Sequence, residues 1–141
     1  MALRWRAVGI EIDGVHHITL RVSDLERSRS FYAGVLGLAA DQDFPGEKLR
    51  FRLGPYTRLV LHPPLPGTPS EDRFNERRIG LDHLSLGVRG RAELDRLVTV
   101  LRGSGVRTQG VREPGVVNFR DPDGIAWELY EQSGEPAAHG R

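Results

Sequence analysis

Residues 15–22 alternate between apolar and polar side chains, a pattern typical of a strand that buries one face. The apolar face holds three branched aliphatic side chains: Ile18, Leu20 and Val22. The other face holds an imidazole, a hydroxyl and a guanidinium: His17, Thr19 and Arg21. The pattern therefore predicts a half-buried strand whose polar face is available for chemistry.

A helix is predicted directly after this strand. Ser23-Asp24-Leu25-Glu26 matches a capping box with Ser23 as the N-cap. Apolar residues then recur at helical spacing, and Gly37 is a typical residue just past a helix end, so we expect the helix over 24–36. A turn at Pro45-Gly46 follows, and then two segments with strand alternation: 49–53 and 57–62.

Residues 63–80 form a long loop that contains Pro63, Pro64, Pro66 and Pro69. Prolines at this density exclude a regular strand ladder. A loop of this length is either a lid over a site or a linker between two halves of the chain, and both interpretations stay open.

The second half of the chain repeats the order of the first. Residues 81–88 alternate as 15–22 do, and apolar residues at helical spacing predict a helix over 91–102. Three further strands are predicted: 106–112, 116–120 and 125–131. Asp121-Pro122-Asp123-Gly124 predicts a turn before the last of them.

The sequences of these two halves align as an internal repeat. His17 matches His83 at an offset of 66 residues, and Leu59-Val60-Leu61 matches Trp127-Glu128-Leu129 at an offset of 68. We therefore predict an α+β fold of two tandem βαβββ modules, which form a cupped mixed or antiparallel sheet with helices on its outer face. The expected segments are an N-terminal extension, two modules, a connecting loop and a tail: 1–14, 15–62, 63–80, 81–132 and 133–141.

Polar residues gather on the predicted cup face. Two histidines at equivalent positions and one carboxylate make a 2-His-1-carboxylate set that suits a divalent metal ion: His17, His83 and Glu128. The ion is Fe²⁺, Mn²⁺, Zn²⁺, Ni²⁺ or Co²⁺, and these ligands do not choose among them. His16 competes with His17, but its parity assigns it to the helix-facing side, where we expect packing or hydrogen bonding.

Several stretches of the chain resemble the vicinal oxygen chelate superfamily, which includes glyoxalase I, extradiol dioxygenases, fosfomycin resistance enzymes and bleomycin resistance proteins. The matching stretches are His17-Ile18-Thr19-Leu20-Arg21-Val22-Ser23-Asp24, Phe31-Tyr32, Leu36-Gly37-Leu38, Gly80-Leu81-Asp82-His83-Leu84 and the run from Asp121 to Leu129. The resemblance implies paired βαβββ modules and a metal held by the same three ligands. It also implies a homodimer whose metal sites are shared between two chains.

One position departs from this family pattern. Glyoxalase I has a fourth ligand, a glutamate, where this chain has Val60, and valine cannot bind a metal. We therefore expect dioxygenase-like chemistry, or addition of a thiol or water, rather than glyoxalase I chemistry. Thr19 also matches the fosfomycin enzymes. The alternative is a metal-free, drug-sequestering protein of the bleomycin resistance type.

Further cup-face residues are candidates for work on a small, oxygenated, anionic substrate. The acid/base candidates are Tyr130 and His62. The substrate-binding candidates are Thr19, Arg21, Arg50, Arg52, Arg58 and Asn118. Four of them are arginines, whose guanidinium fork suits carboxylates and phosphonates.

The composition of the chain excludes several classes of binding partner and of chemistry. Twenty basic residues balance 19 acidic ones, which gives no electrostatic footprint for nucleic acid or a membrane surface. Without cysteine, disulfides, thiolate ligands and a cysteine nucleophile are excluded. No apolar run has signal-peptide or membrane-span length, so we expect a cytoplasmic protein.

Overall fold

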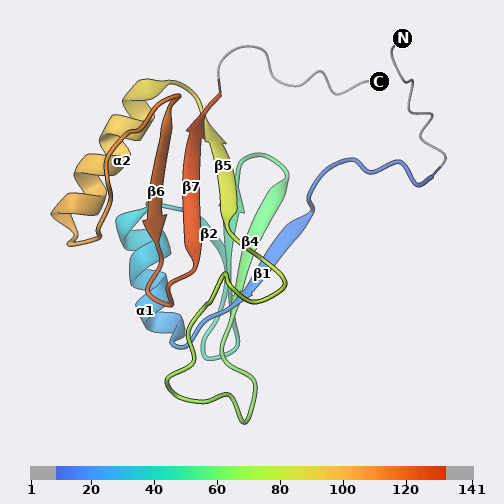
Figure 1. The fold of residues 1–141 in the computed structure, drawn as a ribbon. Coiled ribbons are helices and arrows are strands. Elements are labelled where there is room, and N and C mark those ends of the chain that lie inside the picture. The colour runs from blue at the N-terminus through green and yellow to red at the C-terminus, as the bar shows by residue number, and fades with distance from the viewer. Residues whose placement is uncertain (1–8, 133–141) are drawn as a thin grey trace.

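The computed structural model describes residues 9–132, in two mixed sheets with three helical segments, of which the first two are contiguous (Figure 1). Residues 1–8 of the expected N-terminal extension and the expected tail over 133–141 lie outside the described residues. In chain order the elements are β1 His17–Arg21, α1 Leu25–Arg29, a π-helical segment Ser30–Val35, β2 Ala40–Phe44, β3 Lys48–Leu53, β4 Thr57–His62, β5 Leu84–Val88, α2 Arg91–Gly103, β6 Val116–Arg120 and β7 Ala126–Glu131.

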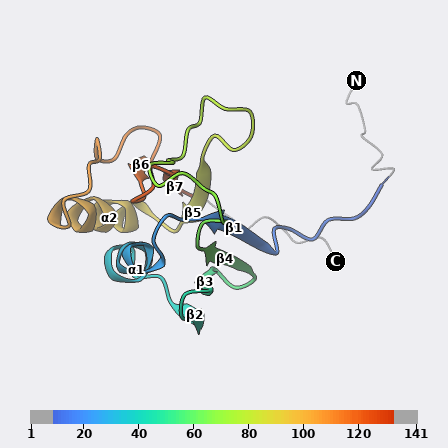
Figure 2. The same cartoon turned by 90° about the horizontal axis from the view of Figure 1, so that it is seen from below.

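Each sheet contains one parallel strand pair, which lies at one edge of the sheet. The first sheet has the order β1-β4-β3-β2, with β1 parallel to β4 and the other pairs antiparallel. The second has the order β5-β7-β6, with β5 parallel to β7 and β6 antiparallel to it. Seen from below, α1 and α2 lie side by side in the angle between the two sheets (Figure 2). The α+β class predicted from the repeat is confirmed.

Strand alternation was predicted correctly on both sheets. Leu20 and Val22 are buried, whereas Thr19 and Arg21 are exposed. On β7, Trp127 is buried. The buried faces therefore meet the helices, and the polar faces point away from them.

Three local predictions were wrong. The N-cap of α1 is Asp24, whose carboxylate accepts the backbone N–H of Arg27, because the Ser23 hydroxyl is engaged with Asp123 instead. Residues 40–44, where no strand was predicted, form the edge strand β2, and the predicted turn at Pro45-Gly46 follows it. Residues 106–112 are not a strand, and of these only Arg112 makes a single bridge, with Val116.

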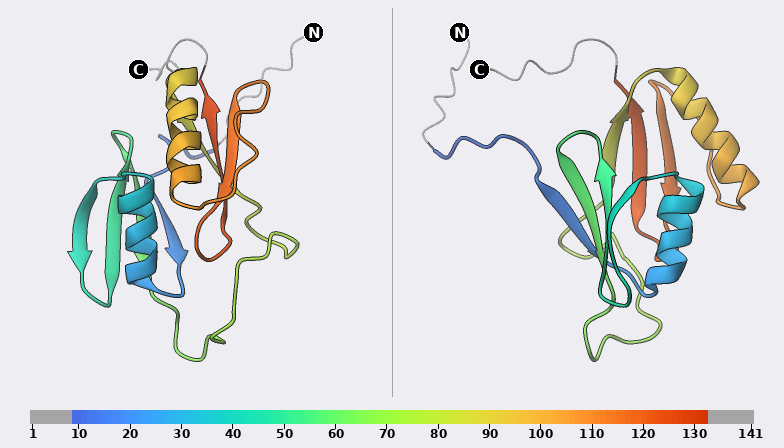
Figure 3. Two further views of the ribbon diagram at one scale, coloured as in Figure 1. Left: turned by 90° about the vertical axis from the view of Figure 1, so that its left-hand side faces the viewer. Right: turned by 180° about the vertical axis from the view of Figure 1, so that it is seen from behind.

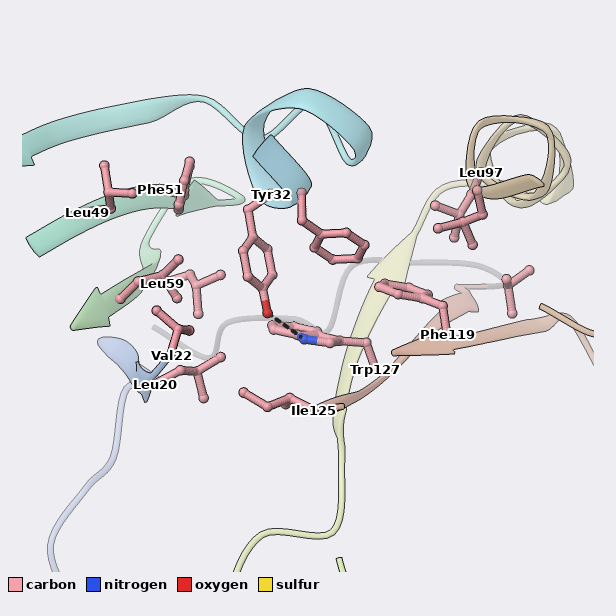
Figure 4. Close-up of a cluster of buried hydrophobic side chains, with 14 of the residues drawn as sticks. Leu20, Val22, Tyr32, Leu49, Phe51, Leu59, Leu97, Phe119, Ile125 and Trp127 are labelled. Atoms are coloured by element: carbon pink, nitrogen blue, oxygen red, sulfur yellow. Dashed lines mark hydrogen bonds between the residues drawn. The ribbon is translucent and has the colours of Figure 1, made fainter. Parts of the chain in front are cut away.

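One continuous core joins the two halves of the chain (Figure 4). Tyr32 reaches from the π-helical segment to the second sheet, where its hydroxyl donates to Asp121 at 2.7 Å and accepts from the indole N–H of Trp127 at 3.0 Å. Burial raises the pKa of both Tyr32 and Asp121. A buried hydroxyl must have partners, so this network fixes the relative position of the modules.

A second set of polar contacts joins the two modules at the edge of this core. Asp123, from the turn before β7, accepts the backbone N–H of Ser23 at 3.0 Å and the Ser23 hydroxyl at 2.5 Å. Arg27 forms an ion pair with the same carboxylate at 3.1 Å. Both views of Figure 3 show the long loop, residues 63–80, which connects the first sheet to the second. Within residues 9–132, no helix has the length and apolar character needed to cross a bilayer.

Candidate metal centre

Two of the three predicted ligands meet on the polar face of the second sheet. His83 immediately precedes β5, and Glu128 lies at the centre of β7, opposite Ser85 of β5 and Asn118 of β6. The Nε2 atom of His83 is 3.1 Å from Oε1 of Glu128. Glu128 is 15% exposed and His83 is 43% exposed, so the pair is open to a ligand.

Asp82 holds the other side of the imidazole, with its Oδ1 atom 2.5 Å from Nδ1 of His83. The hydrogen bond to Asp82 and the negative charge of Glu128 raise the pKa of His83. A carboxylate at Nδ1 fixes the ring so that Nε2 points toward Glu128, an arrangement that is common around metal-binding histidines. Strand periodicity did not find Asp82, because alternation over 81–88 assigned it to the apolar face, whereas residues 82 and 83 precede β5.

His17 does not join this pair within one chain. Among the described residues, no group of three or more histidine, aspartate and glutamate side chains is placed to hold a metal ion. His17 begins β1 on the first sheet, where its Nδ1 atom is 2.8 Å from Nδ1 of His16. His16 is exposed, so its expected packing on the helix side was wrong, although it is hydrogen-bonded as predicted.

The predicted arginines of the first sheet gather around one carboxylate. Asp41 accepts from Arg50 at 2.8 Å and from Arg58 at 2.9 Å, and Arg52 approaches it to 3.8 Å. Hydrogen bonds from Arg50 and Arg58 lower the pKa of Asp41. Arg21 instead donates to the carbonyl of Pro63 at 2.9 Å. These side chains already have partners in the chain.

A cavity of about 1110 Å³ lies beside the His83–Glu128 pair. Its wall includes Asn118 and four arginines: Arg102, Arg107, Arg112 and Arg120. Arg120 is paired with Glu76 at 2.5 Å, and the pairing lowers the pKa of Glu76. The other three arginines make no ion pair with any of residues 9–132, so their guanidinium groups are free to bind an anion, although the wall also contains Glu76, Asp82, Asp121 and Glu128.

The sequence prediction missed these cavity arginines. Three of them come from the end of α2 and the following loop, which had been predicted to contain a strand. Of the predicted substrate contacts, only Asn118 lines this cavity; the others belong to the first module.

The two acid/base candidates occupy equivalent places in the two sheets. Tyr130 follows Glu128 by two residues on β7, opposite Gly87, and is 39% exposed. His62 lies opposite Arg21 at the end of β4, and its Nδ1 atom is 3.2 Å from the carbonyl of Glu47. Tyr130 is therefore the candidate on the same sheet as the His83–Glu128 pair.

Comparison with known proteins places this chain in a family. A model of the Glyoxalase/Bleomycin resistance protein/Dioxygenase superfamily matches residues 14–129, and the chain belongs to this superfamily. A glyoxylase/bleomycin resistance protein/dioxygenase domain from Frankia sp. EAN1pec is 31% identical, with a TM-score of 0.78, and the match covers 87% of this chain and 100% of that one.

Two further relatives carry functional names. The metallothiol transferase FosB of Staphylococcus saprophyticus is 26% identical over 140 residues, which cover 84% of this chain and 77% of the relative. TnmS3, an antibiotic binding protein from Streptomyces sp. CB03234, has a TM-score of 0.65 and 26% identity, with 89% of this chain and 100% of that chain covered. This chain is thus similar both to a metallothiol transferase and to an antibiotic binding protein.

Proposed function

We propose that this protein is a metal-dependent enzyme that acts on a small, oxygenated, anionic substrate. The observation that carries the proposal is the convergence of His83 Nε2 and Glu128 Oε1 at 3.1 Å, with Asp82 fixing the imidazole. An imidazole and a carboxylate are ligands that suit divalent first-row metals. The similarity to the metallothiol transferase FosB supports the same chemistry.

His17 completes the ligand set in the proposal, as the first-module ligand supplied by a second copy of the chain. The separation of His17 from the pair within one chain supports a site shared across a homodimer. The metal is Fe²⁺, Mn²⁺, Zn²⁺, Ni²⁺ or Co²⁺; once bound, it would supply Lewis-acid stabilisation of negative charge on the substrate oxygens.

The residues of the chain have separate tasks in this scheme. The unpaired arginines of the cavity bind the anionic part of the substrate, because guanidinium groups match carboxylate and phosphonate oxygens. Tyr130, about 7 Å along β7 from Glu128 by strand rise, is the nearer acid/base candidate for proton transfer. Valine at position 60 leaves three protein ligands, which favours dioxygenase-like chemistry or addition of a thiol or water.

Metal titration tests the proposal. Protein stripped with a chelator is titrated in a calorimeter with each candidate ion, and we expect saturable binding that His83→Ala removes. His16→Ala is the comparison: it removes the hydrogen-bond partner of His17 but no ligand, so it should weaken binding far less than His83→Ala does. Wild-type protein that takes up none of the five ions would overturn the enzyme proposal.

Mixing two defective variants tests the shared site. His17→Ala and His83→Ala each lose metal binding, but a heterodimer of the two contains one site with all its ligands. Subunit exchange at equal concentrations is therefore expected to restore about a quarter of the sites, by simple counting of a two-fold symmetric dimer. A site built within one chain would stay at zero after mixing.

A binding protein is the second candidate, favoured by the similarity to the antibiotic binding protein TnmS3 and by the large cavity. Such a protein would hold an anionic drug in the cavity without a metal. The two proposals separate in one measurement: ligand binding that is unchanged by chelator and by His83→Ala supports sequestration.

A further inference from the structure

A hydrogen-bonded chain extends outward from the His83–Glu128 pair. Oε1 of Glu128 faces His83, and its second oxygen, Oε2, accepts from the Asn118 amide at 3.2 Å. The Asn118 carbonyl oxygen in turn accepts from Nη2 of Arg112 at 2.9 Å. The contacts therefore connect the predicted ligand to the loop that lines the cavity through one neutral amide.

We infer that Asn118 and Arg112 are positioning residues, which hold Glu128 with Oε1 directed at Nε2 of His83 and so strengthen metal binding. The inference rests on the proposed metal site and assigns a new role to Asn118, which sequence reasoning had placed among the substrate contacts. Neither residue is a ligand; both act through Glu128.

The backbone brings Asn118 to this position. Asn118 and Glu128 are directly opposite each other in the antiparallel β6–β7 ladder, so their side chains leave the same face of the sheet as neighbours. Asn118 is partly buried, and the pair is held by a ladder that continues on both sides of it, from Val116 to Arg120. The contact is therefore a product of the strand register.

Arg112 determines which end of the amide faces Glu128. A guanidinium has only donors, so it binds the carbonyl oxygen of Asn118 and leaves the NH₂ group for the carboxylate. Without Arg112 the amide is free to rotate by half a turn and to present its oxygen to Glu128, which would repel the carboxylate. Arg112 thus stabilises the one amide orientation that supports the ligand.

The same arginine lies in the cavity wall. Only one of its five N–H donors is used by Asn118, and its side chain makes no ion pair within residues 9–132. An anion that binds the remaining donors further orders the guanidinium and, through Asn118, the ligand Glu128. Metal and anion affinities are then linked, and the linkage is reciprocal.

Calorimetric titration with Zn²⁺ alone tests these roles. Loss of an outer partner of a ligand typically weakens metal binding, so Asn118→Ala is expected to lower Zn²⁺ affinity by about 10–100-fold. Arg112→Ala is expected to lower it less, since water then solvates the amide. Arg107→Ala is the matched control: it removes another unpaired arginine of the same wall, outside the hydrogen-bonded chain.

A double-mutant cycle separates a relay from a general effect of charge. If Arg112 acts through Asn118, the double variant Asn118→Ala/Arg112→Ala binds Zn²⁺ as well as Asn118→Ala alone, because the second change has nothing left to act on. Additive losses, or an equal loss in Arg107→Ala, would overturn the relay. Thermal unfolding of each variant checks the fold, and Arg112→Ala alters only an exposed loop side chain.

The outcomes also distinguish this inference from the proposed function. Wild-type protein that binds no Zn²⁺ overturns both. A second outcome is that wild-type protein binds Zn²⁺, His83→Ala does not, and Asn118→Ala binds as tightly as wild type. That outcome supports the metal site and overturns the positioning role alone.

Discussion

The two sheets share one strand register but carry different residues at its centre. In the first sheet, Val60 of β4 lies between Thr19 of β1 and Arg50 of β3. In the second, Glu128 of β7 lies between Ser85 of β5 and Asn118 of β6. The strand arrangement is duplicated, and the identity of this one residue decides which sheet carries a carboxylate on its central strand position.

The sheets also differ in how they treat their arginines. The first sheet has a fourth strand, β2, which brings Asp41 to Arg50 and Arg58 and neutralises part of their charge. In the second sheet, a loop takes the place of that strand within the described residues. This loop lines the cavity and contributes arginines that have no ion pair there, so one repeat is closed by an edge strand and the other is open to a ligand.

Removal of a ligand from the second sheet gives the largest effect that we expect. His83→Ala strips one of three proposed ligands and should lower metal affinity by more than about a thousandfold, because a ligand contributes far more than its outer partners, which are worth about 10–100-fold. Equilibrium dialysis with Zn²⁺ measures the loss. Ser85→Ala, on the neighbouring strand of the same face, should leave the affinity nearly unchanged; equal losses in both variants would contradict the assignment.

Much of the frame followed from periodicity alone. The segments 57–62 and 116–120 coincide with β4 and β6, because alternation is strong where one strand face is buried. β2 was missed because it is an edge strand with little apolar alternation, held by backbone pairing with β3. The strand predicted over 106–112 fails because Val106 and Val111, five residues apart, both pack on the core, which no strand period allows.

Only those site residues that lie in regularly alternating strands could be assigned to a face from the sequence. Parity put Glu128 and Asn118 on one face, and the repeat paired His83 with His17. Asp82, Arg107 and Arg112 lie outside the regular elements, where sequence spacing gives no direction to a side chain. The Ser23 cap was lost to Asp123, 100 residues away, a contact that no local pattern reveals.

Equivalent core residues test whether the two modules fold as one unit. Leu59 and Trp127 occupy matching places in the two sheets, and both are buried. Trp127→Ala should lower the free energy of unfolding by about 3–5 kcal/mol and Leu59→Ala by about 2–5 kcal/mol, since both leave cavities. In urea monitored by circular dichroism, each variant should show one shifted transition, because Tyr32 and Ser23 tie the modules together. Two transitions, each moved by one variant, would show independent modules.

Val60→Glu makes the first sheet resemble the second. Val60 is 8% exposed, so the new carboxylate is expected to lower the free energy of unfolding by about 1–3 kcal/mol as its desolvation cost. The new glutamate would lie opposite Thr19 in the β1–β4 ladder, two residues from Arg58, which is opposite His17. In the shared site it should therefore act as a fourth ligand and raise Zn²⁺ affinity. Val60→Gln is the control: it carries a similar burial cost without the charge. Equal Zn²⁺ affinities in the two variants would argue against a site near Val60.

Asp41→Asn removes the acid that distinguishes the first sheet, and we expect the smallest effect here. Hydrogen bonds from Arg50 and Arg58 lower the pKa of Asp41, so the folded state favours the ionised form. Its contribution to stability is therefore complete above the ordinary carboxyl pKa of about 3.9 and disappears as the pH falls through the lower folded value. Urea unfolding at neutral pH and at about pH 3 should show a smaller difference between the two free energies of unfolding in Asp41→Asn than in the wild type.

Glu71→Gln, in the connecting loop, changes an acid that makes no ion pair with the described residues and should leave that difference as it is in the wild type. If both variants respond alike, Asp41 is no more than a surface charge, and the closure of the first sheet comes from the backbone pairing of β2 alone.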